Sequence, residues 1–165
     1  MIKFTNDYSI LLKKVKEELL SFQIQSDEKC VIKYAEIPWF PGGQTSMNLI
    51  FHLESNKYRL AFKTWNYLKD SDNFSIGIYS LENLSFTTEI KILNENENRY
   101  ISKLISEIIE FPENLNCLNS IVLDGVDHFL IIEKENVTKE YFWKIPNDNL
   151  NLFLKIINVL KDKTS

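Results

Sequence analysis

The feature that most constrains the fold is a pair of strand-like segments near the C-terminus, followed by a helical pattern. The first segment, His128-Phe129-Leu130-Ile131-Ile132, leads through a turn at Glu135-Asn136 to Tyr141-Phe142-Trp143. Pro146-Asn147-Asp148 then opens an amphipathic pattern that continues to Leu160. Two strands joined by so short a turn are antiparallel, and a helix with one apolar stripe needs a surface to cover. The pattern therefore predicts a β-hairpin closed by a helix.

Periodic apolar residues predict further elements along the rest of the chain. Helical spacing predicts one helix from about 7 to 22 and another over about 100 to 108, with Glu95 and Glu97 at its positive end. The segment Lys69–Asn73 is predicted to be a polar loop. Strands are predicted at Cys30–Ala35, Met47–Leu53, Tyr58–Phe62, Phe74–Tyr79, Phe86–Leu93 and Ile121–Leu123. We expect one α+β domain over residues 1–165, with an antiparallel sheet of about six to eight strands and three helices, N-terminal, middle and C-terminal.

Length and charge narrow the class of protein. A chain of 165 residues with 44% apolar residues can form its own core without a metal or disulfide. The net charge of −4 argues against non-specific binding of nucleic acid, which needs clustered basic residues. No apolar run approaches the ~20 residues that span a bilayer, and the N-terminus lacks the apolar region of a signal peptide. These features predict a cytoplasmic protein that contacts neither membrane nor nucleic acid.

The residues that could bind a metal do not have the spacing of a metal site. Cys30 and Cys117 are far apart and have apolar neighbours, which is typical of core cysteines. Asp124-Gly125-Val126-Asp127-His128 holds two carboxylates and a histidine, and could form a metal or acid–base site. The same string is typical of a turn that re-enters a sheet. We favour the turn, and expect no metal and no cofactor.

The sequence contains no recognisable catalytic motif. There is no Gly-x-Ser-x-Gly elbow, and Gly42-Gly43 lacks the lysine of a phosphate-binding loop. His52 and His128 are the only histidines, and both fall in predicted strands. A general acid–base pair would require them to meet in one cleft. We therefore expect no catalytic residues, and a shared His52–His128 pocket would favour a small-molecule binder or enzyme instead.

Candidate contact residues are aromatic or acidic. Trp39 and Phe40 stand beside Pro41-Gly42-Gly43, where a loop would either expose them as interface anchors or fold them onto the core. The acidic candidates would form either a solvated rim or a face that attracts a basic partner, and they are Asp70, Asp72, Glu133, Glu135 and Glu140. Alternation in Tyr141-Phe142-Trp143 puts apolar side chains on both faces, which is typical of a central strand.

The C-terminal part resembles a group of small bacterial α+β proteins. The residues that carry the resemblance are Leu123-Asp124-Gly125, Tyr141-Phe142-Trp143, Pro146 and the closing helix, about a quarter of the chain. Some proteins of this group are immunity proteins of polymorphic toxin systems. The resemblance implies a role in binding and blocking a toxin domain, and no individual residue role follows from it.

Three functional hypotheses result from the sequence. The first is a non-enzymatic protein-binding module, an immunity-type inhibitor whose partner is a basic toxin domain or another protein. The second is a small-molecule-binding protein or enzyme with a pocket between sheet and helices. The third is a homodimer that forms through an aromatic face of the sheet.

Overall fold

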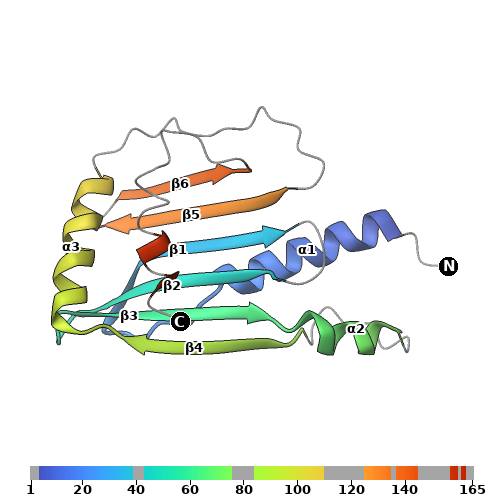
Figure 1. Cartoon of the computed structure of the whole chain (residues 1–165), viewed down its shortest axis with the longest axis horizontal. Coiled ribbons are helices and arrows are strands. Elements are labelled where there is room, and N and C mark those ends of the chain that lie inside the picture. Colours follow the sequence, from blue (N-terminus) through green and yellow to red (C-terminus); the bar gives the residue numbers. More distant parts are fainter. Residues whose placement is uncertain are drawn as a thin grey trace.

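The computed structural model describes residues 4–38, 43–75, 84–109, 125–134, 137–144, 157–159 and 161–162. Its centre is an open six-stranded sheet with the order β4-β3-β2-β1-β5-β6, in which all neighbouring strands are antiparallel (Figure 1). The strands are β1 (Glu28–Pro38), β2 (Thr45–His52), β3 (Lys57–Trp65), β4 (Phe86–Ile92), β5 (Val126–Lys134) and β6 (Val137–Trp143). The helices are α1 (Phe4–Leu20), α2 (Tyr67–Ser75), α3 (Glu95–Ile109) and a C-terminal helix of which residues 157–159 and 161–162 are described. The predicted α+β class is confirmed.

Helices cover both faces of the sheet. On the side that we call the α1 face, Leu11, Val15 and Leu19 are buried together with Trp65 of β3. The opposite side, the α3 face, is covered by α3 and by residues 157–159 and 161–162 (Figure 1). Its core combines the helical stripe of α3 with apolar residues of five strands, including Ile101, Leu104, Ile105, Tyr34, Leu49, Leu60, Leu130 and Trp143. The described apolar stripes of α1 and α3 therefore contribute to the core, whereas Tyr100 of α3 is exposed.

An irregularity in β1 places successive apolar side chains of this strand on different faces of the sheet. The pairing of β1 with β2 shifts between Cys30 and Ile32, which is a β-bulge at Val31. Cys30 therefore packs with Ile50 on the α1 face, whereas Ile32 belongs to the core of the α3 face. Burial raises the pKa of the Cys30 thiol to about 11, so this cysteine is an unreactive core residue as expected. The second cysteine, Cys117, lies outside the described residues.

Side-chain hydrogen bonds satisfy backbone groups at the start of α3 and at the end of α1. At the start of α3, the Asn94 side chain accepts a hydrogen bond from Glu97 N, and the Glu97 carboxylate accepts one from Asn94 N. This reciprocal pair is a capping box. At the end of α1, Ser46 of β2 and Lys63 of β3 donate to the carbonyls of Leu19 and Glu18. The sheet thereby fixes the position of α1.

Two predicted elements differ from the structure. The prediction of a polar loop at Lys69–Asn73 is wrong, because these residues belong to α2, where Asp70 N donates to Asn66 O. The strand predicted at Phe74–Tyr79 is wrong at its start, because Phe74 and Ser75 end α2. Its remaining residues lie outside the described part, as do the predicted strand at 121–123, the turn at 135–136 and most of the closing helix.

Candidate functional site

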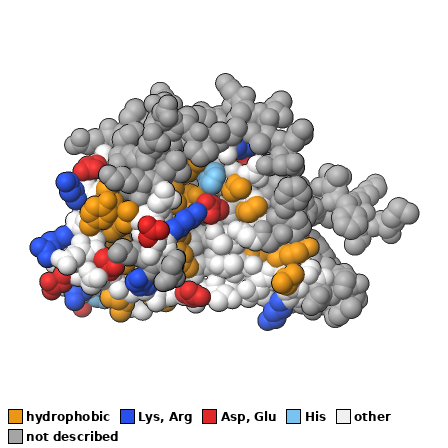
Figure 2. All heavy atoms as spheres, in the orientation of Figure 1, with side chains coloured by type: hydrophobic (Ala, Val, Ile, Leu, Met, Phe, Trp, Pro, Cys, Tyr) orange, Lys and Arg blue, Asp and Glu red, His pale blue; other side chains and the backbone are white. Residues whose placement is uncertain are grey.

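A row of side chains crosses the whole sheet on the α3 face. Strand pairing aligns one residue from each strand, and from β6 to β4 these are Trp143, His128, Glu36, Thr45, Thr64 and Thr87. The row lies at the end of the sheet opposite to α3 (Figure 1). On this side of the molecule, an area without charged side chains is visible right of centre in Figure 2. The row combines an indole, an imidazole, one carboxylate and three threonine hydroxyls.

A tyrosine, a histidine and a glutamate form a hydrogen-bonded cluster at one half of this row. Tyr34 Oη lies 2.9 Å from Glu36 Oε1 and 2.7 Å from His128 Nδ1. A tyrosine hydroxyl has one proton to donate, and the carboxylate can only accept. The hydroxyl therefore donates to Glu36, and His128 Nδ1–H donates to the hydroxyl oxygen.

This arrangement places a proton on Nδ1 of His128. Burial lowers the pKa of His128, which favours the neutral imidazole, and burial likewise raises the pKa of Tyr34. A neutral imidazole with its proton on Nδ1 leaves Nε2 as a proton acceptor. The ring stacks on Trp143 with centroids 5.2 Å apart and an interplanar angle of 8°. His128, Tyr34 and Glu36 thus form one hydrogen-bonded chain that packs against Trp143.

Lys161 connects the C-terminal helix to this cluster. Its Nζ donates to Glu36 Oε1 at 2.6 Å, and it also lies 5.9 Å from the centroid of the Tyr34 ring. The ion pair neutralises the carboxylate that accepts from Tyr34. This partly buried ion pair attaches the closing helix to β1.

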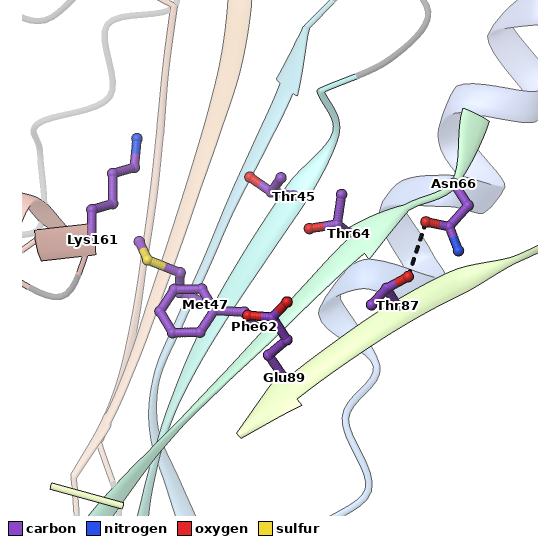
Figure 3. A pocket seen from close by; sticks show the side chains of 8 residues that line it. All are labelled: Thr45, Met47, Phe62, Thr64, Asn66, Thr87, Glu89 and Lys161. Carbon is purple, nitrogen blue, oxygen red and sulfur yellow. Dashed lines mark hydrogen bonds between the residues drawn. The ribbon is translucent and has the colours of Figure 1, made fainter. Parts of the chain in front are cut away.

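A pocket of about 460 Å³ lies next to the cluster. Met47 and Phe62 form its apolar floor, and Lys161 and Glu89 lie on opposite sides of them (Figure 3). The remaining lining is uncharged and polar, and consists of Thr45, Thr64, Asn66 and Thr87. Thr87 Oγ1 donates to Asn66 Oδ1 at 3.0 Å, which orients that wall. The pocket can accommodate a group with both polar and apolar parts.

The strand that forms one wall of this pocket is also an open edge of the sheet. Among the described strands, β4 has a neighbour on one side only, namely β3. Ile90 and Ile92 are 58% and 74% exposed. Every residue of β4 after Phe86 is exposed, so both faces of the strand are open to solvent. An edge strand presents unpaired N–H and C=O groups that can pair with another chain. Pocket and edge are contiguous through Thr87 and Glu89.

The two histidines do not form the acid–base pair considered from the sequence. His52 pairs with Glu28 of β1, whereas His128 pairs with Glu36, eight positions further along the same strand. At ~3.3 Å per residue the two sites are roughly 26 Å apart. His52 instead binds Asp27 through Nε2 at 3.0 Å. Asp127 and His128 point to opposite faces of β5, so they do not share a metal site either.

The acidic candidates do not assemble into one surface. Asp70 is 2% exposed, and its carboxylate accepts hydrogen bonds from Trp65 Nε1 and Ser85 N, so its prediction as a contact residue is wrong. Glu133 and Glu140 lie near each other on β5 and β6, where Glu133 forms an ion pair with Lys33. Asp72 is in α2, and no more is described of it. Trp39, Phe40 and Glu135 lie outside the described residues.

The aromatic cluster of β6 belongs to the core. Tyr141 and Trp143 are buried on the α3 face, while Phe142 packs against Phe129 on the other. The prediction that they share a face is confirmed, but β6 is an end strand of the described sheet and not a central one. Strand β6 therefore does not expose the aromatic surface through which the predicted homodimer would form.

Sequence reasoning missed Tyr34, Glu36, Lys161 and the exposed edge of β4. Tyr34 is one residue of the predicted strand Cys30–Ala35, whereas Glu36 and Lys161 lie just beyond the predicted strand and the predicted closing helix. Their convergence depends on the order of the strands, which local patterns do not contain. Within the described residues no group of three or more histidine, cysteine, aspartate or glutamate side chains could hold a metal ion.

Comparison with protein-family models, curated proteins and solved structures finds no match to this chain. Of the helices that the structure describes, none has the length and apolar character needed to cross a bilayer. The site must therefore be interpreted from its own geometry.

Proposed function

We propose that this chain is a non-enzymatic protein-binding module that pairs the edge of β4 with an extended segment of a protein partner. The observation that carries the proposal is the exposure of β4 on both faces together with its open edge. Addition of a strand would satisfy the backbone groups along that edge. It would also cover Ile90 and Ile92, two large apolar side chains that water now surrounds.

The proposal includes an inhibitory, immunity-type role. A net charge of −4 suits a basic partner, because complementary charge speeds association and disfavours acidic competitors. The resemblance of the C-terminal hairpin and helix to immunity proteins points to a toxin domain as that partner. The proposal also assigns the protein to the cytoplasm, where such an inhibitor would meet its toxin.

Among the described residues, His128 makes no hydrogen bond to a cysteine, serine or threonine side chain, which supports a non-enzymatic role. In the part of the chain that is described, the buried thiol of Cys30 lies at the other end of β1 from His128, and Ser46 faces α1. A histidine base needs a proton to abstract within hydrogen-bonding reach. We therefore interpret the Tyr34–His128–Glu36 cluster as a polar network that fixes the closing helix.

A small-molecule-binding role is the second candidate. It is favoured by the pocket of about 460 Å³, whose volume falls within the range typical of ligand sites. Its lining from β2, β3, β4 and Lys161 combines apolar and hydrogen-bonding groups. If this candidate is correct, a compound bound in the pocket should protect the chain against thermal unfolding without any protein present.

Affinity capture from the native cell with matched variants tests the leading proposal. The full chain is used as wild type, as Ile90→Lys and as the control Ile10→Lys. Ile10 is a similarly exposed isoleucine of α1, a helix that packs on β1, β2 and β3. We expect a protein captured by the wild type and by Ile10→Lys to be lost with Ile90→Lys, because the change puts a charge where an added strand would cover an apolar side chain.

Two results would contradict strand addition by a different protein. One is retention of the captured protein by Ile90→Lys at the wild-type level. The other is a molar mass near twice 19.5 kDa for the purified wild type in light scattering, reduced to the single mass by Ile90→Lys. That second result would assign the edge to another copy of the chain.

A further inference from the structure

We propose that the pocket beside β4 receives a lysine or arginine side chain of the partner segment, and that Glu89 binds its cationic group. The inference rests on the proposed function, because it assumes that a segment lies along β4. It adds the chemistry of the partner, namely a basic residue on the side of the segment that faces the pocket.

The charges around the pocket favour a cation. Glu89 is exposed at the pocket wall, and the described part of the chain offers its carboxylate no hydrogen bond or ion pair. The cationic residue of the lining, Lys161, is already bound to Glu36 at 2.6 Å. Of the two charged residues in the described lining, Glu89 is therefore the one whose charge is not compensated. An acidic side chain would be repelled there, and a neutral one would leave the carboxylate unpaired.

The shape of the lining favours a cation on an apolar stem. Figure 3 shows Met47 and Phe62 side by side between Glu89 and Lys161. The methylene groups of lysine or arginine pack well on such a floor, while the charged head remains near polar groups. A cation within about 6 Å of the Phe62 ring would gain a further attraction. Thr64 and Thr87 hydroxyls can accept hydrogen bonds from the same head group.

The position of Glu89 connects the pocket to the edge. Glu89 pairs with Phe62 of β3, so its side chain projects from the α3 face of the strand to which the partner would add. Side chains directly opposite each other on neighbouring strands have Cβ atoms about 5 Å apart. A basic residue opposite Glu89 would therefore reach its carboxylate, and the backbone of the same segment could continue along β4.

A titration with a small probe tests this inference without the partner. The uniformly ¹⁵N-labelled full chain is titrated with N-acetyl-L-arginine amide, and the neutral N-acetyl-L-norleucine amide serves as the matched probe. We expect arginine-specific shifts at Thr64, Thr87 and Glu89. Glu89→Gln should weaken binding about five-fold, the change expected for one exposed ion pair. The control Glu95→Gln, at an exposed carboxylate of α3, should leave binding unchanged.

Two results would overturn the inference: equal binding of the norleucine probe, or equal affinity of Glu89→Gln for the arginine probe. The capture experiment separates this failure from failure of the proposed function. If Ile90→Lys abolishes capture while the arginine probe does not bind near Glu89, the edge is a docking site. In that case only the inference of a basic side chain in the pocket is wrong. If Ile90→Lys has no effect on capture, the proposed function itself is wrong.

Discussion

Asp70 is the residue that joins the end of β3, the helix α2 and the start of β4. Its Oδ2 accepts hydrogen bonds from Trp65 Nε1 at 2.7 Å and from Ser85 N at 2.8 Å. The side chains of Trp65 and Asp70 are both buried, so the indole N–H depends on this acceptor. The carboxylate is thus a structural acceptor.

Replacing Asp70 with alanine should lower the free energy of unfolding by about 1–3 kcal/mol, because it leaves the buried indole N–H of Trp65 without an acceptor. Urea unfolding of the purified variant measures this change. Lys69→Ala, at an exposed neighbour in α2, is the control and should unfold at the wild-type urea concentration. An Asp70→Ala variant as stable as the control would show that the carboxylate does not hold these elements.

The pattern of residues could not distinguish Asp70 from an exposed acid. Its sequence neighbours Lys69, Ser71 and Asp72 are polar, so the segment has the composition of a surface loop. What buries the carboxylate is Ser85, fifteen positions away, and the indole of Trp65. By contrast, the predicted role of Cys30 as a core residue is confirmed, because its apolar neighbours in β1 are local.

His128 should make stability depend on pH. Burial lowers its pKa in the folded state, while in the unfolded state it titrates near its ordinary value of about 6.5. Below pH 6.5 the unfolded state therefore binds more protons, so stability falls as the pH falls through this window. His128→Phe retains an aromatic ring beside Trp143 and cannot titrate.

Thermal unfolding between pH 7.5 and 5 measures this effect. The wild type should lose more stability than His128→Phe as the pH decreases from 6.5 to 5, whereas above pH 7 the two pH profiles should be parallel. Carboxylates and His52 are present in both proteins and cancel in the comparison. Parallel profiles over the whole range would contradict a depressed pKa for His128.

At the scale of elements, the sheet and α1 are coupled through the C-terminal end of the helix. Helix ends carry carbonyls without partners inside the helix, and α1 has no basic residue in its last turn. Lys63 Nζ donates to Glu18 O at 2.5 Å and lies 4.7 Å from the centre of the Phe86 ring. Ser46 Oγ donates to Leu19 O at 2.7 Å. Strands β2 and β3 thus supply the cap that the helix lacks.

Lys63→Met should loosen the last turn of α1. The variant keeps much of the apolar stem and removes the donor, so we expect a loss of about 0.5–1.5 kcal/mol. Hydrogen exchange should become faster at the amides of Leu19 to Ser21, and Lys57→Met, at an exposed position of the same strand, should leave those amides unchanged. Equal exchange in Lys63→Met and wild type would exclude the capping role.

Elements with strong periodicity could be predicted from sequence, and those held by distant contacts could not. The alternation in Met47–Phe62 predicts the β2–β3 hairpin, and the spacing of Leu11, Val15 and Leu19 predicts α1, because both patterns report burial along one element. α2 was missed because it is short and polar. The alternation in β4 predicts a strand, but not that both of its faces remain exposed.

At the scale of the molecule, the order of the strands decides which surface is available. The core of the α3 face includes residues of β5 and β6, such as Leu130 and Trp143, and α1 packs on β1, β2 and β3. Strand β4 is left at the end of the sheet, with the side chains that follow Phe86 exposed to water. This position also makes it one wall of the pocket that contains Glu89. The proposed docking site and the proposed basic-residue pocket thus depend on one feature of the architecture.

The most direct test of partner binding at β4 is hydrogen exchange of the wild-type chain, measured alone and in complex with its purified partner. Strand addition predicts that amides of Phe86–Ile92 exchange more slowly in the complex, while those of β6, the other end strand, keep their rates. If the amides of β4 exchange equally fast with and without the partner, the partner binds elsewhere and the edge is not the docking site.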